Sequence, residues 1–296
     1  MAIPEAQLET WSRQGAIQSS SDTYQAVKRV LESEDAPYRD NSYEVFLQGS
    51  YANDTNVYAE SDVDIVIRLD DCFHSDLESL TEAERVTWRS TYVDATYTYP
   101  SFKRDVIHVL RKMYGDAVHV GNKAISIDRA NNRRKADVLV TTAFRRYFSF
   151  DGMRGERYQE GVCFFDANGE RIENYPKAHS ANLTSRHQQS GRWLKPTIRM
   201  LKNMRSRLVE LGCIQATAAP SYYLEGLLYN VPNDKFGGNL HECFVNAFTW
   251  IQQANKAEFL CANEQFYLLR DNAHTCWSTR DGQAFIDAVI ELWNNW

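Results

Sequence analysis

Alternating apolar and polar residues dominate the first 175 positions of the chain and predict a β-sheet. In residues 62–69, Val63, Ile65, Ile67 and Leu69 occupy every second position, so they line one face of a strand. Further strands are expected at 44–48, 118–127, 135–141, 143–149 and 161–165. A serine-rich start at 19–22 predicts a helix that leads into the sheet, and helices are also expected at 76–93 and 102–114. Between the first two strands, residues 49–50 are expected to turn and residues 53–56 to form a loop.

Beyond Pro176 the apolar spacing becomes helical, which predicts a second domain. Proline interrupts a regular element, so residues 1–175 are assigned to one domain and residues 176–296 to the other. One helix is expected to begin at Pro196 and end at Gly212. Its apolar stripe is formed by Ile198, Leu201, Met204, Leu208 and Leu211, and its opposite side carries Arg199, Lys202 and Arg205. Later helices are expected at 221–230, 239–255 and 281–294, with a loop at 231–238.

The composition is that of an ordinary folded protein with an acidic balance of charge. The net charge is -6 and the sequence pI about 5.7, whereas proteins that coat nucleic acid are normally basic. The expected partner is therefore a small anion held in a local basic pocket. The six cysteines include no C-x-x-C pair, and the chain shows neither a leader nor an apolar run of the roughly 20 residues that span a bilayer. We expect reduced thiols, no membrane partner and a cytoplasmic location.

Three aspartates are the candidate catalytic residues. Asp62 and Asp64 stand two apart in an apolar strand, so they project from the same face, and Asp137 lies in a second apolar run, 135–140. Neighbouring carboxylates repel each other, and a divalent cation or a shared proton offsets that repulsion. The third carboxylate favours the cation. Carboxylate oxygens suit Mg²⁺, with Mn²⁺ as a substitute, and the lack of a His/Cys cluster argues against zinc. In nucleotidyl transfer, Asp62 and Asp64 would bind two metal ions and Asp137 would complete the site that activates the attacking hydroxyl.

Gly49 and Ser50 are the candidate phosphate-binding residues. Glycine lets a backbone approach a ligand closely, and exposed amides together with a serine hydroxyl can cradle a phosphate. Each motif also has an ordinary interpretation. A Gly-Ser pair is usually a turn, an Asp-x-Asp also occurs in sugar-nucleotide glycosyltransferases and calcium sites, and Asp137 alone could be an acid at a strand end. Their combination, in this order and in strand-like surroundings, favours nucleotidyl transfer.

These motifs resemble a known signature. Gln48-Gly49-Ser50, Asp62-Val63-Asp64 and Asp137 resemble the DNA polymerase β-like nucleotidyltransferases. The stretch from Leu47 to Thr55, continued by residues 61–64, is similar to the bacterial cGAS/DncV-like nucleotidyltransferases (CD-NTases). Residues 133–137, 199–205 and 220–225 extend the similarity, which covers roughly residues 45–230.

The resemblance implies an α+β, bilobal protein: a polymerase β-like core with a mixed sheet, and a C-terminal helical lobe like that of the oligoadenylate synthetases. Nucleoside triphosphates would bind between the two lobes. By similarity, Lys202 and Ser221 would hold the triphosphate of the donor nucleotide, together with Gln48, Gly49 and Ser50. Tyr222 would stack on its base, and both roles fit the chemistry of an ammonium and an aromatic ring.

The implied activity is template-independent, Mg²⁺-dependent synthesis of a cyclic di- or trinucleotide second messenger in antiphage (CBASS-type) defence. Its substrates would be ATP, GTP or UTP, and its partners regulatory or effector proteins of a defence operon. The vertebrate cyclic GMP-AMP synthase grips DNA with a zinc-binding insertion, and this chain has no Cys/His cluster to build one. Direct activation by double-stranded DNA is therefore not expected. His179 and His187 lack metal-ligand spacing and are interpreted as structural or solvated.

Other functions remain open from the sequence. The same fold could make a linear oligonucleotide or transfer a nucleotide to RNA or protein. A catalytically silent nucleotide-binding module is disfavoured by the presence of all three aspartates. A sugar-nucleotide glycosyltransferase would need neither Gly49-Ser50 nor Asp137.

Overall fold

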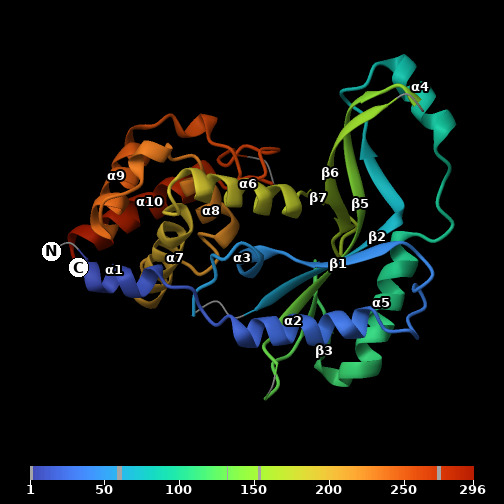
Figure 1. The fold of residues 1–296 in the computed structure, drawn as a ribbon, viewed down its shortest axis with the longest axis horizontal. Helices are drawn as coiled ribbons and strands as arrows, with labels where there is room; N and C mark the ends of the chain where they lie inside the picture. The colour runs from blue at the N-terminus through green and yellow to red at the C-terminus, as the bar shows by residue number, and fades with distance from the viewer. Residues whose placement is uncertain (1–2, 59–61, 132, 153–154, 272–274) are drawn as a thin grey trace. The chain divides into compact units, whose positions relative to one another are not determined.

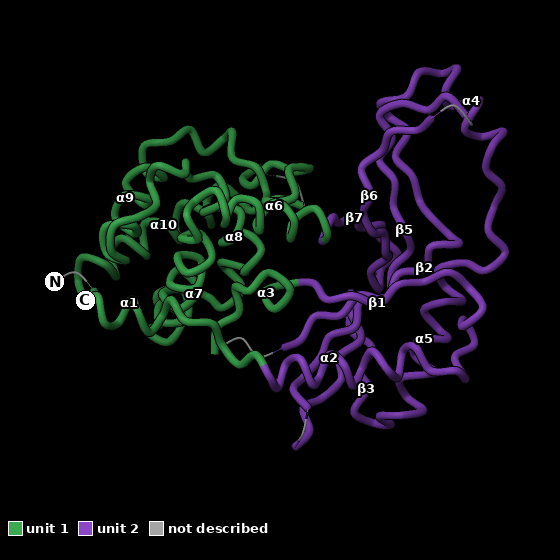
Figure 2. The backbone as a smooth tube through the Cα atoms, viewed as in Figure 1, with its two compact units in different colours: residues 1–17, 49–61, 177–296 green, residues 18–48, 62–176 purple. Residues whose placement is uncertain are grey.

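The computed structural model describes residues 3–58, 62–131, 133–152, 155–271 and 275–296, which belong to two compact units (Figures 1 and 2). Residues 18–48 and 62–176 form a unit built on a β-sheet, which we call the sheet unit. Residues 1–17, 49–61 and 177–296 form a unit of helices, which we call the helical unit. A single cut at 175/176 therefore does not reproduce the compact units, because two early segments pack with the C-terminal helices. The functional division into two domains stays a prediction.

A mixed sheet of seven described strands is the centre of the sheet unit. β1 (Tyr43–Leu47) pairs antiparallel with β2 (Val63–Asp76), and β2 pairs parallel with β5 (Ala136–Phe150). The antiparallel partners of β5 are β4 (Ile125–Ile127) and β6 (Glu156–Phe165), which pair in turn with β3 (Val118–Val120) and β7 (Arg171–Asn174). The path through the sheet is β1-β2-β5-β4-β3. Two long parallel strands thus start side by side in its middle.

Two amphipathic helices pack on this sheet. α2 (Gln18–Leu31) and α5 (Tyr99–Tyr114) contact each other and the strands (Figure 1). They bury Val27 and Leu31 from α2 and Phe102, Val106 and Leu110 from α5. These positions follow helical spacing, so the hydrophobic effect fixes which face of each helix meets the sheet. A short 3-10 turn, Gly115–Ala117, follows α5.

Several boundaries differ from the sequence predictions. The expected strands 135–141 and 143–149 form one continuous strand, β5. Two buried threonines lie at the predicted break, and their hydroxyls form hydrogen bonds within the sheet. Thr141 donates to the Ile67 carbonyl and Thr142 donates to the Cys163 carbonyl, so the strand can continue through them. The helix expected at 76–93 is shorter, since β2 continues to Asp76. It is α4 (Glu82–Thr91), which starts with a capping box between Thr81 and Glu84. α2 begins at Gln18, one residue before the predicted start.

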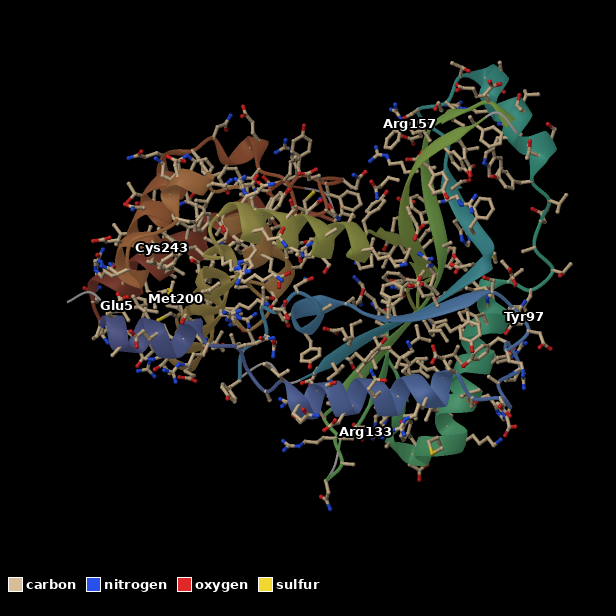
Figure 3. The ribbon with its side chains drawn as sticks, in the orientation of Figure 1. Glu5, Tyr97, Arg133, Arg157, Met200 and Cys243 are labelled. Carbon is tan, nitrogen blue, oxygen red and sulfur yellow. The ribbon has the colours of Figure 1, made fainter. Side chains whose placement is uncertain are left out.

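The helical unit is packed around α7 (Leu194–Glu210), whose most extensive helix contacts are with four helices. These are α1 (Glu5–Ser12), α8 (Ser221–Tyr229), α9 (Leu240–Gln253) and α10 (Thr279–Asn294). Met200 of α7 is fully buried in this core, and Cys243 of α9 is fully buried beside Thr197 of α7 (Figure 3). The unit also contains α3 (Gly49–Ala52), α6 (Pro176–Gln189) and 3-10 turns at Asn233–Lys235 and Lys256–Glu258.

The predicted stripe of α7 is only partly right. Ile198, Leu201, Met204 and Leu208 are buried, but Leu211 lies after the last helical residue and is 50% exposed. Pro196 is the third helical residue and not the first, because the helix begins at Leu194. Gly212 adopts a φ of 71°, the left-handed conformation typical of a helix end. All six cysteines are free, and no helix among the described residues is long and apolar enough to cross a bilayer.

Candidate functional site

The three predicted acids lie at the start of the two parallel strands of the sheet unit. Asp64 of β2 and Asp137 of β5 are register partners, and Asp62 immediately precedes β2. Paired residues of adjacent parallel strands point to the same face of a sheet, and Asp62 stands two residues before Asp64. The backbone therefore places all three aspartates at one end of this strand pair, although Asp137 is far from Asp62 and Asp64 in the sequence.

A lysine ammonium lies between two of these acids. Nζ of Lys135 is 2.7 Å from Oδ2 of Asp62 and 3.5 Å from Oδ1 of Asp137. The hydrogen bond to Asp62 raises the pKa of Lys135, so the amine stays charged. Burial raises the pKa of Asp137. The charge of Asp62 raises this pKa further, and the nearby Lys135 ammonium lowers it. The acids thus form a site that already attracts a positive charge.

This conformation does not present a formed set of metal ligands. Among the described residues, no group of three or more His, Cys, Asp or Glu side chains is arranged to hold a metal ion. The carboxylates of Asp62 and Asp137 instead bind Lys135. Their chemistry still fits Mg²⁺, because the site offers hard oxygen donors and its negative charge is offset by a cation.

Gln48 and Gly49 connect the acid-bearing strand to the helical unit. The backbone N–H of Gln48 donates to the Asp64 carbonyl at 3.0 Å, so the end of β1 is fixed to the start of β2. Gly49 then adopts a φ of 69°, which an L-residue reaches only with strain. The predicted turn at Gly49-Ser50 is the first part of the one-turn helix α3, which ends at Ala52. The Ser50 carbonyl accepts the N–H of Thr55 at 2.9 Å, which closes the segment on itself.

The loop 53–56 is held by charged residues of the helical unit. Asn53 donates to Glu225 at 3.0 Å, and the hydroxyl of Thr55 donates to the same carboxylate. The carboxylate of Asp54 forms an ion pair with Nζ of Lys195 at 2.9 Å, and the Asp54 backbone has a positive φ of 54°. The predicted loop is therefore fixed by three of its side chains.

Lys202 is not on a solvated side of α7. Its side chain is 0% exposed, and Nζ lies 2.9 Å from Oε1 of Glu225 and 3.1 Å from Oγ1 of Thr55. Its place opposite the apolar stripe therefore does not expose Lys202 to solvent, and its predicted role in nucleotide binding stays a prediction. Helical spacing alone could not show this, because the charged partner lies on another helix, 23 residues later.

Tyr222 is packed and not free. Its ring stacks on that of His179, with centroids 4.8 Å apart and planes at 23°. Its hydroxyl accepts a hydrogen bond from Asn263 at 2.8 Å, and burial raises its pKa. Ser221 precedes it as the first residue of α8. His179 is 4% exposed, which favours the structural interpretation over the solvated one.

Glu225 is the most important residue that the sequence predictions missed. It lies in the helix expected at 221–230, next to Leu224, and is 2% exposed. A signal was available, because an acid flanked by apolar helical residues needs a buried partner. The sequence could not name Lys202, Thr55, Asn53 and His179 as those partners.

The sheet unit also contains a cavity of about 1010 Å³ away from the acids. It is lined mainly by apolar side chains of β2, α4 and α5, among them Phe73, Trp88 and Tyr99. None of the predicted site residues lines it. Large volume alone therefore does not mark the position of the predicted chemistry.

Comparison with known proteins assigns the family. The model of the cGAS/DncV-like nucleotidyltransferase C-terminal helical domain matches residues 181–294. The cyclic UMP-AMP synthase of Rhodothermus marinus is 37% identical to this chain, over 100% of this chain and 99% of the relative. The chain belongs to the cGAS/DncV-like nucleotidyltransferases. The predicted family and enzyme class are confirmed.

Two further matches support the assignment of this chain to the cGAS/DncV-like nucleotidyltransferases. The cyclic nucleotide synthase CdnE01 of Staphylococcus haemolyticus is 35% identical over the full length of both chains, 100% of each. The structure of the Rhodothermus marinus CdnE c-UMP-AMP synthase with Apcpp and Upnpp has a TM-score of 0.88 and 36% identity, and covers 99% of this chain and 97% of that one. The α+β class with a mixed sheet and a C-terminal helical domain is therefore confirmed.

Proposed function

We propose that this nucleotidyltransferase converts nucleoside triphosphates into a cyclic di- or trinucleotide, with release of pyrophosphate at each bond. The observation that carries this proposal is the full-length similarity to a cyclic UMP-AMP synthase. ATP and UTP are accordingly the first substrates to test, with GTP and CTP as the comparison. A role in antiphage defence, effector proteins from a defence operon and a cytoplasmic location stay predictions.

Asp62, Asp64 and Asp137 are proposed to bind Mg²⁺, with Mn²⁺ as a substitute. The register of Asp64 with Asp137 and the ammonium beside Asp62 support a cation site at this end of the strands. When bound, the metal ions would make the attacking hydroxyl more nucleophilic and neutralise the pyrophosphate leaving group. The carboxylates would position that hydroxyl, and Asp137 would accept its proton.

The nucleotide contacts are proposed to come from Gln48, Gly49, Ser50, Lys202, Ser221 and Tyr222. Lys202 is connected to Ser50 through Thr55, since Thr55 contacts the Lys202 ammonium and donates its N–H to the Ser50 carbonyl. This connection supports a shared role, in which the buried Lys202 ammonium acts on triphosphate oxygens through the segment that carries Ser50. Tyr222 would stack on the base, with its ring fixed from the other side by His179.

Product analysis tests the proposal. The purified protein is incubated with all four NTPs and Mg²⁺ or Mn²⁺, treated with phosphatase, and analysed by mass spectrometry. A cyclic product has no terminal phosphate and keeps its mass, whereas a linear product loses its terminal phosphates and is detected as a dephosphorylated oligonucleotide. Survival of a cyclic product in the wild type, and its loss in Asp62→Asn/Asp64→Asn, would support the proposal. Asp71→Asn is the matched control, because Asp71 is an exposed acid later on β2.

Other outcomes would replace the proposal with an alternative. Oligonucleotide products that all lose terminal phosphates in the phosphatase treatment would indicate linear oligonucleotide synthesis. Labelled nucleotide that stays on added RNA or protein would indicate transfer to a macromolecule. Consumption of a UDP-sugar in place of NTPs would indicate a glycosyltransferase.

A further inference from the structure

Glu225 is a buried carboxylate that joins three separate parts of the helical unit. Oε1 accepts from Nζ of Lys202 on α7 at 2.9 Å and from the Thr55 hydroxyl. Oε2 accepts from Nδ2 of Asn53 at 3.0 Å and from Nε2 of His179 on α6 at 2.7 Å. Both carboxylate oxygens therefore have two partners each.

The network is built for an ionised carboxylate. Burial alone would raise the pKa of Glu225, but the Lys202 ammonium and hydrogen bonds from His179 and Thr55 hold it below its ordinary value. Glu225 and Lys202 are 2% and 0% exposed, so neither charge is screened by water. A buried ion pair is weak as a source of stability, because desolvation offsets the attraction. Its better-attested use is to fix one arrangement of the surrounding groups.

The groups that Glu225 holds are adjacent to the proposed nucleotide contacts. Lys202 is bound directly, and Ser50 is reached through Thr55. Tyr222 is reached through the stacked ring of His179. Ser221 and Tyr222 stand four and three residues before Glu225 on α8, positions that share one face of a helix.

We propose that Glu225 is the positioning residue of the triphosphate contacts in the helical unit. Its charge holds the buried Lys202 ammonium and the Thr55 hydroxyl together, and through Thr55 it fixes the segment from Ser50 to Thr55, so that this segment is preorganised for phosphate oxygens. Glu225 acts through these groups and needs no contact with the substrate. This inference rests on the proposed function, because it assumes a nucleoside triphosphate as the ligand.

The central test is Glu225→Gln, which keeps the shape of the side chain but removes its charge and one acceptor. Dissociation constants are measured by calorimetry for a non-hydrolysable ATP analogue and for AMP. A loosened fold would weaken both ligands alike, so the ratio of the two constants isolates the phosphate contacts. The preference for the triphosphate is expected to fall about tenfold, the effect of one charged hydrogen bond.

Three further variants make the result specific. Glu225→Asp keeps the charge, so it is expected to retain more of the triphosphate preference than Glu225→Gln. Thr55→Val removes one contact of the carboxylate and is expected to lower the preference severalfold. Glu210→Gln removes an exposed acid that pairs with Arg207 at the end of α7, and is expected to leave both constants unchanged.

The outcomes separate this inference from the proposed function. If the wild type binds neither ligand and makes no cyclic product, the proposed function fails. If the wild type prefers the triphosphate and Glu225→Gln keeps that preference, the positioning role of Glu225 is refuted and the function stands. If circular dichroism shows that Glu225→Gln does not fold, Thr55→Val decides, and an unchanged ratio in that variant overturns the inference.

Discussion

Removal of the Lys202 ammonium is expected to destabilise the helical unit severely. Lys202→Met keeps most of the side-chain volume but leaves the Glu225 carboxylate buried without its counter-charge. The two side chains of this pair are 0% and 3% exposed. Breaking a buried pair by removal of one partner costs about 3–5 kcal/mol. Lys235 and Asp234 form a pair in the same unit with side chains 38% and 68% exposed, and such a pair is worth only about 0–1 kcal/mol.

Urea unfolding compares Lys202→Met with Lys235→Met. Six of the seven tryptophans belong to the helical unit, Trp88 being the exception, so tryptophan fluorescence reports mainly on this unit. With a urea dependence of about 2 kcal/mol per molar, a loss of about 4 kcal/mol lowers the midpoint by about 2 M. The control is expected to shift by less than about 0.5 M.

A double variant isolates the charge. Lys202→Met combined with Glu225→Gln removes both charges, so it is expected to unfold at a higher urea concentration than Lys202→Met alone. Equal midpoints for Lys202→Met and Lys235→Met would refute the reasoning. So would a double variant that is less stable than the single one, because the uncompensated charge would then not be the cause.

Three other changes have defined outcomes. Asp62→Asn with Asp64→Asn should abolish cyclic product in the phosphatase assay and leave the circular dichroism spectrum unchanged; full activity would remove the metal site from the mechanism. Tyr222→Ala should raise KM for nucleotides about 5- to 160-fold, from stacking worth roughly 1–3 kcal/mol, and an unchanged KM for every NTP would exclude it from the pocket. Burial and the Lys195 ammonium lower the pKa of His187 from 6.5 to about 4. As the pH falls from 6.5 to 4, His187 therefore takes up a proton in the unfolded chain before it does so in the folded protein, and the free energy of unfolding should fall by about 1–2 kcal/mol after allowance for partial exposure. His187→Gln should flatten the dependence of the urea midpoint on pH over this range. An unchanged dependence in the variant would contradict the prediction.

Local patterns predicted the parts of the fold that depend on local chemistry. The alternation around Asp62 and Asp64 correctly indicated a strand beside the acids, and the apolar run at Asp137 indicated its neighbour. The parallel register that places Asp137 opposite Asp64 was not readable, because strand pairing leaves no trace in either strand alone. The buried environment of Lys202 was not readable for a similar reason. A helix reveals the spacing of its own residues and not the buried carboxylate that approaches from another helix.

The assignment of residues 49–61 to the helical unit lay beyond sequence reasoning. Asn53 and Thr55 are separated from Glu225 by 172 and 170 positions, and no short-range pattern encodes such a contact. The resemblance to a nucleotidyltransferase family supplied the candidate residues without their packing. The structure adds which of those residues are held, and by what.

These long separations also affect how the protein is made. During synthesis the segment around Thr55 leaves the ribosome long before Glu225 is translated, because chains grow from the N-terminus. Contacts between distant positions are slow to form, since a long loop must first be closed. An unfinished chain that already carries Asp62, Asp64 and Asp137 still lacks the carboxylate that fixes its phosphate segment. The proposed nucleotide contacts would therefore be held in place only after residue 225 has been translated.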